Sequence, residues 1–283
     1  MAEYVEIFEV GPRDGLQNEA RDIPVAEKIA LVDRLSEAGF RRIECASFVS
    51  PKWVPQMAGS ADVLAGITRV PGVSYAALAP NMRGFEDAVA AKADEIAIFG
   101  SASEGFSRAN INATIADSLE RFRPVAQAAR AIGMPVRGYV SCVTDCPYDG
   151  PVAPDQVARV AAALFAMGCY EISLGDTIGK GTPETIRAML CAVEQEIPVD
   201  RIAGHYHDTG GKALDNIDAS LERGVRVFDA AVGGLGGCPY APGAAGNVAT
   251  EAVVAHLSDR GYETRLDMDV IVAAAGMARA MRS

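Results

Sequence analysis

The sequence predicts an α/β fold, a (β/α)8 TIM barrel with one additional C-terminal helix. Strand-like and helix-like stretches alternate along the chain, the strand-like stretches number eight, and no Gly-x-Gly-x-x-Gly turn follows the first. Strands joined by crossover helices form a parallel sheet, and eight such units close into a barrel. An open doubly wound sheet is the alternative, which the missing glycine turn disfavours. We expect a single catalytic domain over residues 1–283.

Eight apolar runs rich in β-branched residues are predicted as strands, because buried parallel strands read as continuous hydrophobic stretches. They are residues 5–10, 42–49, 73–80, 95–100, 136–143, 171–176, 201–207 and 225–232. Helices are predicted where apolar residues recur at spacings of three and four. They are residues 25–38, 115–132, 155–167, 183–196 and 213–223, with the additional helix at 268–282. Four helices stop at a glycine, namely Gly39, Gly133, Gly168 and Gly224.

Composition and charge exclude several classes of protein. The net charge is -11 without any block of Lys or Arg, which argues against nucleic acid or an anionic membrane as partner. No apolar stretch approaches the roughly 18 residues of a membrane span. The six cysteines are too sparse and irregular for a disulfide framework, so we expect reduced thiols. The absence of a leader pattern and of a peroxisomal tripeptide favours a cytoplasmic protein.

Two of the three histidines, His205 and His207, stand at the end of the seventh predicted strand. Side chains two positions apart in a strand share a face, so both imidazoles point to one place. Imidazole binds divalent metals readily, and two ligands of one ion must project from a common face. Taken alone, the pair is explained equally well as two exposed histidines at a strand end.

The carboxyl ends of the barrel strands are expected to bring further polar residues to one rim, where such folds place their chemistry. They are Arg13, Asp14, Glu44, Arg137, Asp176, Cys238 and Asn247. Each alone has an ordinary explanation, such as a solvated turn, a paired strand carboxylate or a helix cap. Asp14 and Asn247 would add two oxygen ligands to the imidazoles, a mixture that suits Mg2+ or Mn2+, or alternatively Zn2+. Cys238 follows a run of glycines, which makes its thiol a candidate acid, base or nucleophile.

Four stretches carry a resemblance to a known family. They are Gly-Pro-Arg-Asp-Gly-Leu-Gln-Asn-Glu at 11–19, Ser-Phe-Val-Ser-Pro-Lys-Trp-Val-Pro-Gln-Met at 47–57, Ser-Leu-Gly-Asp-Thr-Ile-Gly at 173–179 and Gly-Gly-Cys-Pro-Tyr-Ala at 236–241. They resemble the 3-hydroxy-3-methylglutaryl-CoA lyase family of metal-dependent barrel enzymes. The resemblance spans about residues 5–256. It implies cleavage of that acyl-CoA substrate to acetyl-CoA and acetoacetate with Mg2+ or Mn2+, in a homo-oligomer, expected to be a dimer.

The same resemblance implies roles for individual residues. The metal ligands would be Asp14, His205, His207 and Asn247, and the catalytic residues Arg13, Glu44, Asp176, His205 and Cys238. Retro-Claisen cleavage removes a hydroxyl proton and stabilises a thioester enolate. Arg13 would hold the enolate oxygen, Glu44 would orient Arg13 or a metal-bound water, and Asp176 or His205 would accept the proton. Arg137 would contact the substrate from the rim, and Cys238 would deliver a proton to the enolate carbon.

Two other functions compete with this one. A sister enzyme that condenses acetyl-CoA with a 2-oxo acid would share the barrel, the metal and the two histidines. It is expected to lack the Gly-Gly-Cys-Pro-Tyr loop, which residues 236–240 contain. A catalytically silent barrel that only binds metal and CoA esters is expected to lose Arg13, Glu44 or Cys238, and this chain keeps all three.

The proton-transfer role of Cys238 predicts that Cys238→Ser loses most of its turnover while metal and substrate binding persist. Serine keeps the size and polarity of the side chain but raises the pKa of the group by several units. Steady-state turnover at saturating metal tests this, with Cys142→Ser and Cys191→Ser as controls that retain activity. Near-normal turnover of Cys238→Ser would mean that the thiol is incidental to a glycine-rich lid.

Overall fold

Eight parallel strands close into a barrel at the centre of the molecule, which confirms the predicted fold. The computed structural model describes residues 2–236 and 246–282. Neighbouring strands around the barrel follow the order β10, β11, β2, β3, β4, β5, β6 and β9. Their bounds are β2 (Glu6–Glu9), β3 (Arg42–Ser47), β4 (Ser74–Leu78), β5 (Glu95–Ser101), β6 (Val136–Ser141), β9 (Glu171–Asp176), β10 (Ile202–Tyr206) and β11 (Val227–Ala230). All eight lie within the predicted runs or differ from them by a residue at one end.

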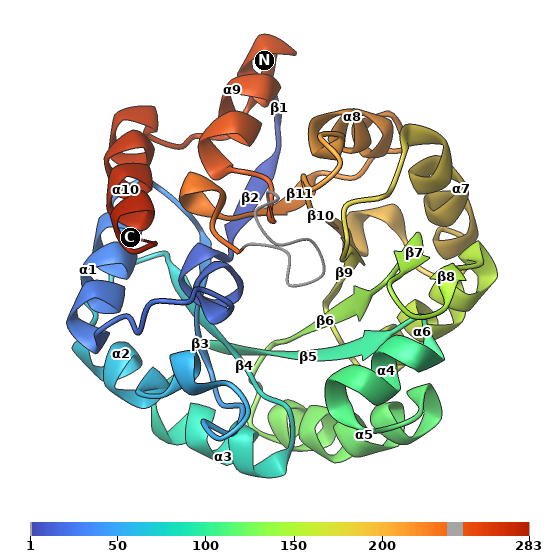
Figure 1. Cartoon of the computed structure of the whole chain (residues 1–283), viewed down its shortest axis with the longest axis horizontal. Helices are drawn as coiled ribbons and strands as arrows, with labels where there is room; N and C mark the ends of the chain where they lie inside the picture. The colour runs from blue at the N-terminus through green and yellow to red at the C-terminus, as the bar shows by residue number, and fades with distance from the viewer. Residues whose placement is uncertain (1, 237–245, 283) are drawn as a thin grey trace.

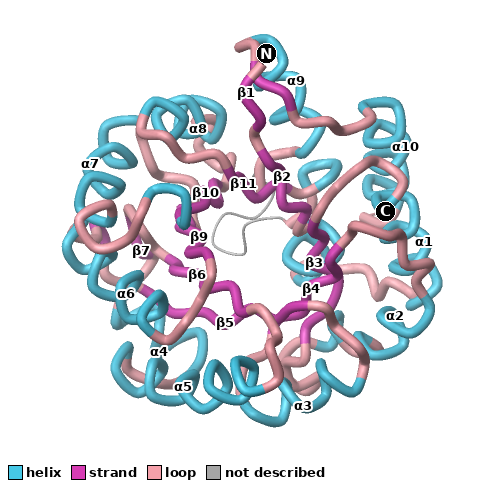
Figure 2. Tube along the Cα trace, turned by 180° about the vertical axis from the view of Figure 1, so that it is seen from behind, coloured by secondary structure: helices cyan, strands magenta, loops and turns pink. Residues whose placement is uncertain are grey.

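Helices surround the barrel on its outside (Figure 1 and Figure 2). The predicted ones are α1 (Val25–Ser36), α5 (Ile115–Ala131), α6 (Pro154–Ala166), α7 (Pro183–Val193), α8 (Ala213–Glu222) and α10 (Met268–Ala280). Four others were missing from the prediction, namely α2 (Ser60–Gly66), α3 (Met82–Ala90), α4 (Glu104–Ile111) and α9 (Thr250–Asp259). In α2, α3 and α4, seven to nine residues give too few turns for a clear 3.6-residue period.

Short elements supplement the barrel. Two parallel two-residue strands, β1 (Glu3–Tyr4) and β12 (Tyr262–Glu263), pair near the N-terminus. A small antiparallel pair, β7 (Asp145–Cys146) and β8 (Gly150–Pro151), follows β6. Among the described residues, no helix is both long and apolar enough to cross a membrane. The cysteines within the described ranges are free thiols.

The predicted glycine stops adopt the left-handed backbone that a helix end needs. The φ angles of Gly39, Gly133, Gly168 and Gly224 are 94°, 70°, 104° and 95°. Glycine enters this region without a steric cost, so each one ends its helix and turns the chain back toward the next strand.

The additional C-terminal helix packs on the chain itself. α10 contacts α1 and the turn at Val232–Gly234, which follows β11, and Figure 1 places it beside α1. Its N-terminus is tied down by Asp267, whose backbone N–H donates to the carbonyl of Ala38 at 2.9 Å. Since the loop after β11 leads to the rim, α10 supports that rim from outside.

Glu9, at the end of β2, ties three rim segments together. Its fully buried carboxylate accepts hydrogen bonds from the N–H of Gly11 at 2.8 Å, the N–H of Val232 at 2.9 Å and the hydroxyl of Thr250 at 2.6 Å. Burial raises the pKa of Glu9 from 4.5 to about 7, although the three donors oppose that shift. One carboxyl group therefore fixes the loops that follow β2 and β11.

A pH dependence of stability follows from Glu9. A carboxyl group whose pKa is raised by folding contributes stability that is fully present below pH 4.5 and is lost as the pH rises through about 7. Glu9→Gln removes the ionisable group and with it this loss. The free energy of unfolding of the variant, relative to that of the wild type, should therefore rise by up to roughly 3 kcal/mol between pH 4.5 and pH 8. Denaturant unfolding at several pH values measures this, with the exposed Glu86→Gln as control. Parallel pH profiles for Glu9→Gln and wild type would contradict it.

Candidate metal and catalytic site

Three segments meet at the carboxyl end of the barrel and carry the predicted ligands. A π-helical turn at Gly11–Gly15 follows β2 and holds Arg13 and Asp14. The backbone packs tightly here: a Cβ on Gly15 would lie 2.6 Å from the Cβ of Leu235, so glycine is required. His205 lies on β10, with His207 just beyond its end. Strand β10 and the turn after β2 thus direct their side chains into the same space.

The strand alternation predicted for the two histidines is confirmed. Both imidazoles point to the same side, with ring centroids 5.4 Å apart. Tyr206, between them, points to the opposite face, where its hydroxyl contacts Ser220 of α8 at 2.7 Å. The period of two in an extended chain is therefore what brings the two rings together.

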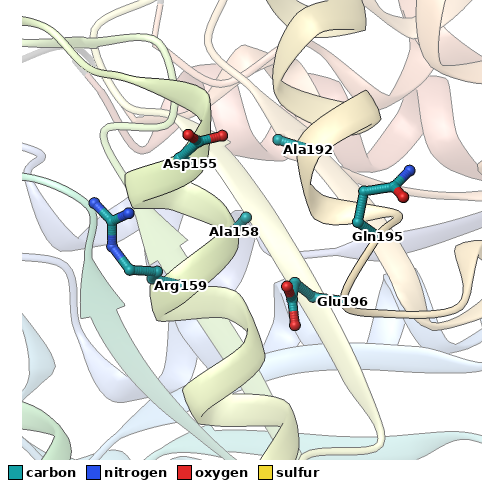
Figure 3. Close-up of a pocket in the computed structure, with 6 residues that line it drawn as sticks. All are labelled: Asp155, Ala158, Arg159, Ala192, Gln195 and Glu196. Atoms are coloured by element: carbon teal, nitrogen blue, oxygen red, sulfur yellow. The ribbon is translucent and has the colours of Figure 1, made fainter.

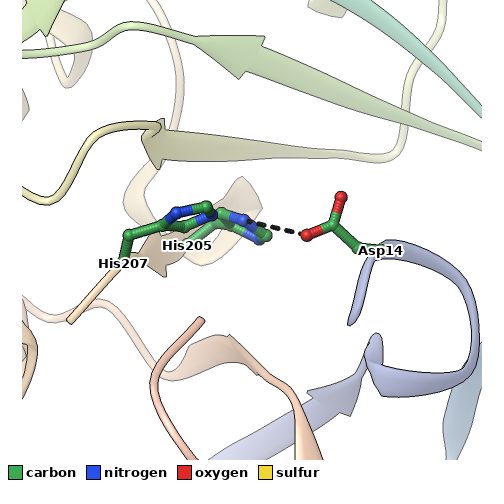
Figure 4. Close-up of side chains that lie close together, drawn as sticks. All are labelled: Asp14, His205 and His207. Carbon is green, nitrogen blue, oxygen red and sulfur yellow. Dashed lines mark ion pairs between the residues drawn. The ribbon is translucent and has the colours of Figure 1, made fainter. Parts of the chain in front are cut away.

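Asp14, His205 and His207 form a group that can hold a metal ion. One ligand atom from each lies within 4.8 Å of the other two, and Nε2 of His205 is 3.9 Å from Oδ2 of Asp14 (Figure 4). Asn247 joins the group, because its amide donates to Oδ2 of Asp14 at 2.8 Å. Its backbone also forms a β-bridge with His207. The structure thus brings together all four residues predicted as ligands.

The protonation states of these residues fit a metal. Burial alone would raise the pKa of Asp14, but Arg13 and the two histidines hold it at about 2. Burial, with the neighbouring His205, lowers the pKa of His207 to about 4. Nδ1 of His207 is buried and has no hydrogen-bond partner among the described residues. A metal ligand must be deprotonated, so a carboxylate and a neutral imidazole with a free nitrogen are the right groups.

His205 differs from His207 in having a fixed partner. Its Nδ1 lies 3.0 Å from Oδ2 of Asp229, on the neighbouring strand β11. Burial would lower the pKa of His205, but this hydrogen bond and the charges of Asp229 and Asp14 outweigh it and raise the pKa. Asp229 itself is buried, and Arg137 and His205 hold its pKa well below the usual range against the effect of burial.

Arg13 is a buried guanidinium held by two carboxylates. Its Nε donates to Oε2 of Glu44 at 2.6 Å and its Nη1 to Oδ1 of Asp14 at 2.7 Å. The hydroxyl of Tyr139 donates to the same oxygen of Glu44 at 3.2 Å. The predicted orienting role of Glu44 toward Arg13 matches this geometry. Glu44 is fully buried, which raises its pKa despite the opposing charge of Arg13.

The expectation that Asp176 faces the site is wrong. Asp176 pairs in register with Tyr206, and like Tyr206 its side chain points away from the barrel interior. It accepts hydrogen bonds from the hydroxyl of Thr144 at 2.9 Å and from the N–H of Gly181 at 2.8 Å. The inward position at this level is taken by Gly175, the register partner of His205. Asp176 therefore shapes the loop after β9 from outside the pocket.

The predicted rim position of Arg137 is also wrong. Arg137 is the second residue of β6, only 1% exposed, and lies deep inside the barrel. Its Nε donates to Glu171 at 2.7 Å, and its two terminal nitrogens donate to Asp229 at 3.0 and 2.7 Å. The prediction failed because it placed Arg137 along the barrel axis from its residue type alone. Cys238, the remaining predicted catalytic residue, lies outside the described residues.

A pocket of ≈ 650 Å³ opens above the metal group. Arg13, Asp14, His205 and His207 line it together with further polar side chains and a set of apolar or aromatic ones. The further polar side chains include Gln17, Asn18, Asn81, Asn110, Asn112 and Arg121. The apolar and aromatic ones are Val49, Trp53, Val54, Leu78, Pro80, Phe99, Phe106, Ala109, Ile111, Phe122, Tyr139 and Val140. A concave pocket that combines apolar walls with convergent polar groups is the usual form of a small-molecule site.

A smaller hollow of ≈ 360 Å³ lies on the outside of the barrel between α6 and α7 (Figure 3). Ala158 and Ala192 form its floor, and charged or amide side chains stand at its edges. These side chains are Asp155, Arg159, Gln195 and Glu196. Figure 3 draws them spread around the gap and pointing in different directions.

The HMGL-like family model matches residues 4–277. The chain belongs to this family. It is 60% identical over 268 residues to the 3-hydroxy-3-isohexenylglutaryl-CoA/hydroxy-methylglutaryl-CoA lyase of Pseudomonas aeruginosa, covering 95% of this chain and 89% of that protein. The crystal structure of an HMG-CoA lyase from Brucella melitensis matches with a TM-score of 0.99, 63% identity and 99% of both chains.

A third relative has a solved structure that contains ligands. The structure of an HMG-CoA lyase from Acinetobacter baumannii in complex with coenzyme A and 3-methylmalate matches with a TM-score of 0.93 and 36% identity. The match covers 99% of this chain and 91% of that one. These relatives confirm the family resemblance drawn from the four motifs.

Asp229 and Tyr139 are residues of this HMGL-like site that the sequence reading missed. Asp229 interrupts the apolar run at 225–232 in the same way that Glu44 interrupts its own strand. A charged residue inside a buried strand needs a partner, so this signal was available. Tyr139 stands two positions after Arg137, on the same strand face. Nothing in the residue itself distinguishes it from an apolar barrel position.

The metal group predicts that His207→Ala weakens Mn2+ affinity by roughly tenfold or more while the fold persists, because a rim ligand is removed without touching the core. Isothermal titration with Mn2+ measures the affinity. His256→Ala is the matched control, since His256 lies on α9 and contacts Asp218 at 2.8 Å, away from the pocket. Equal affinities of His207→Ala and wild type would remove His207 from the site.

Proposed function

We propose that the protein is a divalent-metal-dependent lyase that cleaves 3-hydroxy-3-methylglutaryl-CoA to acetyl-CoA and acetoacetate. The observation that carries the proposal is the buried guanidinium of Arg13, bonded to Asp14 beside His205 and His207 at the base of the pocket. The high identity to relatives named as HMG-CoA lyases supports the same reaction.

The reaction explains why these groups stand together. Retro-Claisen cleavage develops negative charge on the substrate hydroxyl and on the thioester oxygen. Asp14, His205, His207 and Asn247 would hold Mg2+ or Mn2+, which when bound lowers the pKa of the substrate hydroxyl and neutralises its carboxylate. Arg13 faces the pocket and stays charged at any working pH, so it stabilises the enolate oxygen. Glu44 fixes the direction of that guanidinium through Nε.

Two proton transfers complete the reaction. Of the two bases that the sequence left open, Asp176 points out of the pocket, whereas His205 lines it. Nδ1 of His205 is held by Asp229, so His205 accepts the hydroxyl proton through Nε2, at a step in which that atom does not bind the metal. The enolate carbon then needs a proton, and we assign its delivery to Cys238 on the strength of the family motif at residues 236–241. In this assignment the pocket residues bind and polarise the substrate, and the loop after β11 supplies the acid.

The lining of the pocket suits an acyl-CoA. It combines charged groups such as Arg13 with apolar side chains such as Trp53 and Phe106, which suits a charged acyl head and a long pantetheine arm. The bound coenzyme A and 3-methylmalate of the Acinetobacter relative support this class of ligand. We also propose a cytoplasmic homodimer, although relatives include both mitochondrial and cytoplasmic lyases.

A direct assay tests the activity. Purified protein is stripped of metal and incubated with 3-hydroxy-3-methylglutaryl-CoA, with and without Mg2+ or Mn2+, and acetoacetate and acetyl-CoA are quantified. Metal-dependent release of both products in equal amounts supports the proposal. Absence of cleavage with saturating metal would overturn it, and would leave the silent metal-binding and CoA-binding barrel.

The choice of acyl group needs a second substrate. The Pseudomonas relative is named for an isohexenyl as well as a methyl substituent, and the apolar wall of the pocket offers a place for a longer chain. We propose the methyl compound as the main substrate of this protein. Comparing kcat/KM for the two acyl-CoAs decides, and a higher value for the isohexenyl compound would reverse the assignment.

The enolate role of Arg13 predicts that Arg13→Gln lowers kcat by at least about 100-fold with a much smaller change in KM, as expected when stabilisation of developing charge is lost. Steady-state kinetics at saturating metal measures both constants. Arg41→Gln is the matched control, because Arg41 precedes β3 at the opposite end of the barrel and stacks on Tyr4. A defect confined to KM would make Arg13 a plain binding residue.

A further inference from the structure

We propose that Asp229 is a positioning residue that sets the tautomer of His205 and thereby aims its Nε2 at the metal group. The proposal rests on the metal centre of the proposed function, but not on the identity of the substrate. Asp229 does not line the pocket, and it acts only through His205.

The contact is built into the barrel. His205 and Asp229 are register partners on the neighbouring strands β10 and β11, so both side chains point inward at the same level. Oδ2 of Asp229 lies 3.0 Å from Nδ1 of His205 and also accepts the hydroxyl of Ser173 at 2.7 Å. Arg137 donates Nη2 to Oδ1 at 2.7 Å and Nη1 to Oδ2 at 3.0 Å. Asp229 is 2% exposed, so water does not compete for these bonds.

These bonds leave His205 one arrangement as a neutral ligand. A carboxylate beside a guanidinium accepts hydrogen bonds and donates none, so the ring nitrogen facing it must carry the hydrogen. Neutral imidazole has only one N–H, which places the free lone pair on Nε2. Nε2 lies 3.9 Å from Oδ2 of Asp14, and a dashed line marks this pair in Figure 4. A histidine ligand that donates its second nitrogen to a carboxylate has a fixed ring orientation and tautomer.

The two histidines are therefore unequal. Nδ1 of His207 is buried without a partner in the described part of the chain, whereas Nδ1 of His205 is held. It follows that His205 is the ligand oriented in advance. It also follows that His205 has no nitrogen left for accepting the hydroxyl proton while Nε2 binds metal. The base and ligand roles assigned to His205 thus exclude one another within a single turnover step.

Asp229→Asn tests the proposal because it removes the charge of the carboxylate and replaces one of its two accepting oxygens with a donating NH2 group. Arg137 donates to both oxygens of Asp229, so either placement of the NH2 group loses one of these bonds. With the NH2 group toward His205, Nδ1 would have to accept and the hydrogen would move to Nε2. With the amide oxygen toward His205, Nδ1 would donate to a neutral acceptor, which is a weaker bond than the one to a carboxylate. An aspartate-to-asparagine change beside a catalytic histidine has the first of these effects, the change of tautomer, in serine proteases. We expect Mn2+ affinity to fall about 10-fold to 100-fold.

The readouts need no substrate. Mn2+ affinity is measured by titration. The tautomer of His205 is measured by ¹⁵N NMR of Mg2+-loaded protein labelled at its histidines, of which the chain has only three. The control is Asp218→Asn, which alters the equivalent Asp–His contact at His256, 2.8 Å long and outside the pocket. Asp218→Asn should keep wild-type affinity.

Two results would overturn the proposal. One is wild-type Mn2+ affinity in Asp229→Asn. The other is an Nε2–H tautomer of His205 in the wild-type protein, which is decisive even if Asp229→Asn does not fold. Since neither measurement involves the acyl-CoA, a protein that passes both yet fails to cleave 3-hydroxy-3-methylglutaryl-CoA would disprove only the proposed activity.

Discussion

The geometry of the site depends on a buried ion group at the centre of the barrel, formed by Arg137, Asp229 and Glu171. Arg137 donates to both carboxylates and is 1% exposed. Buried charges lose several kcal/mol of hydration each, and they are tolerated only when pairing and hydrogen bonds replace the water. Here the replacement is complete enough that Asp229 stays ionised. The arginine below thus determines the charge of the carboxylate that reaches His205 above.

A second ion group repeats this arrangement on the other side of the pocket. Arg13 joins Glu44, deep in β3, to Asp14 in the turn after β2. Each of two candidate ligands, Asp14 and His205, is therefore connected to a buried arginine. Apolar residues of the same volume would often make such an interior more stable. The buried charges instead fix the directions of Asp14 and His205, which would have no partners in a purely apolar barrel.

The strands and ligands could be predicted from sequence because they depend on short-range periodicity. Parallel strands buried on both faces read as apolar runs, and His205 and His207 share a face because the side-chain period is two. Asp176 and Arg137 were misplaced because their surroundings depend on the register between neighbouring strands. The spacing of residues within one strand carries no information about that register. Once Gly175 is known to pair with His205, the outward direction of Asp176 follows. The short helices α2 and α4 were missed because each has only about two turns.

Unpaired polar atoms in this protein are concentrated at the pocket. Among the described residues, five buried side-chain atoms lack a hydrogen-bond partner. Gln17 and His207, which carry two of them, line the pocket, and Glu44 carries a third directly behind Arg13. An unsatisfied buried acceptor costs about 1–3 kcal/mol, and folded proteins contain few of them. Unpaired atoms at the pocket lower the stability of the folded chain there. The same atoms are already in place to bind a ligand or a metal, which strengthens binding.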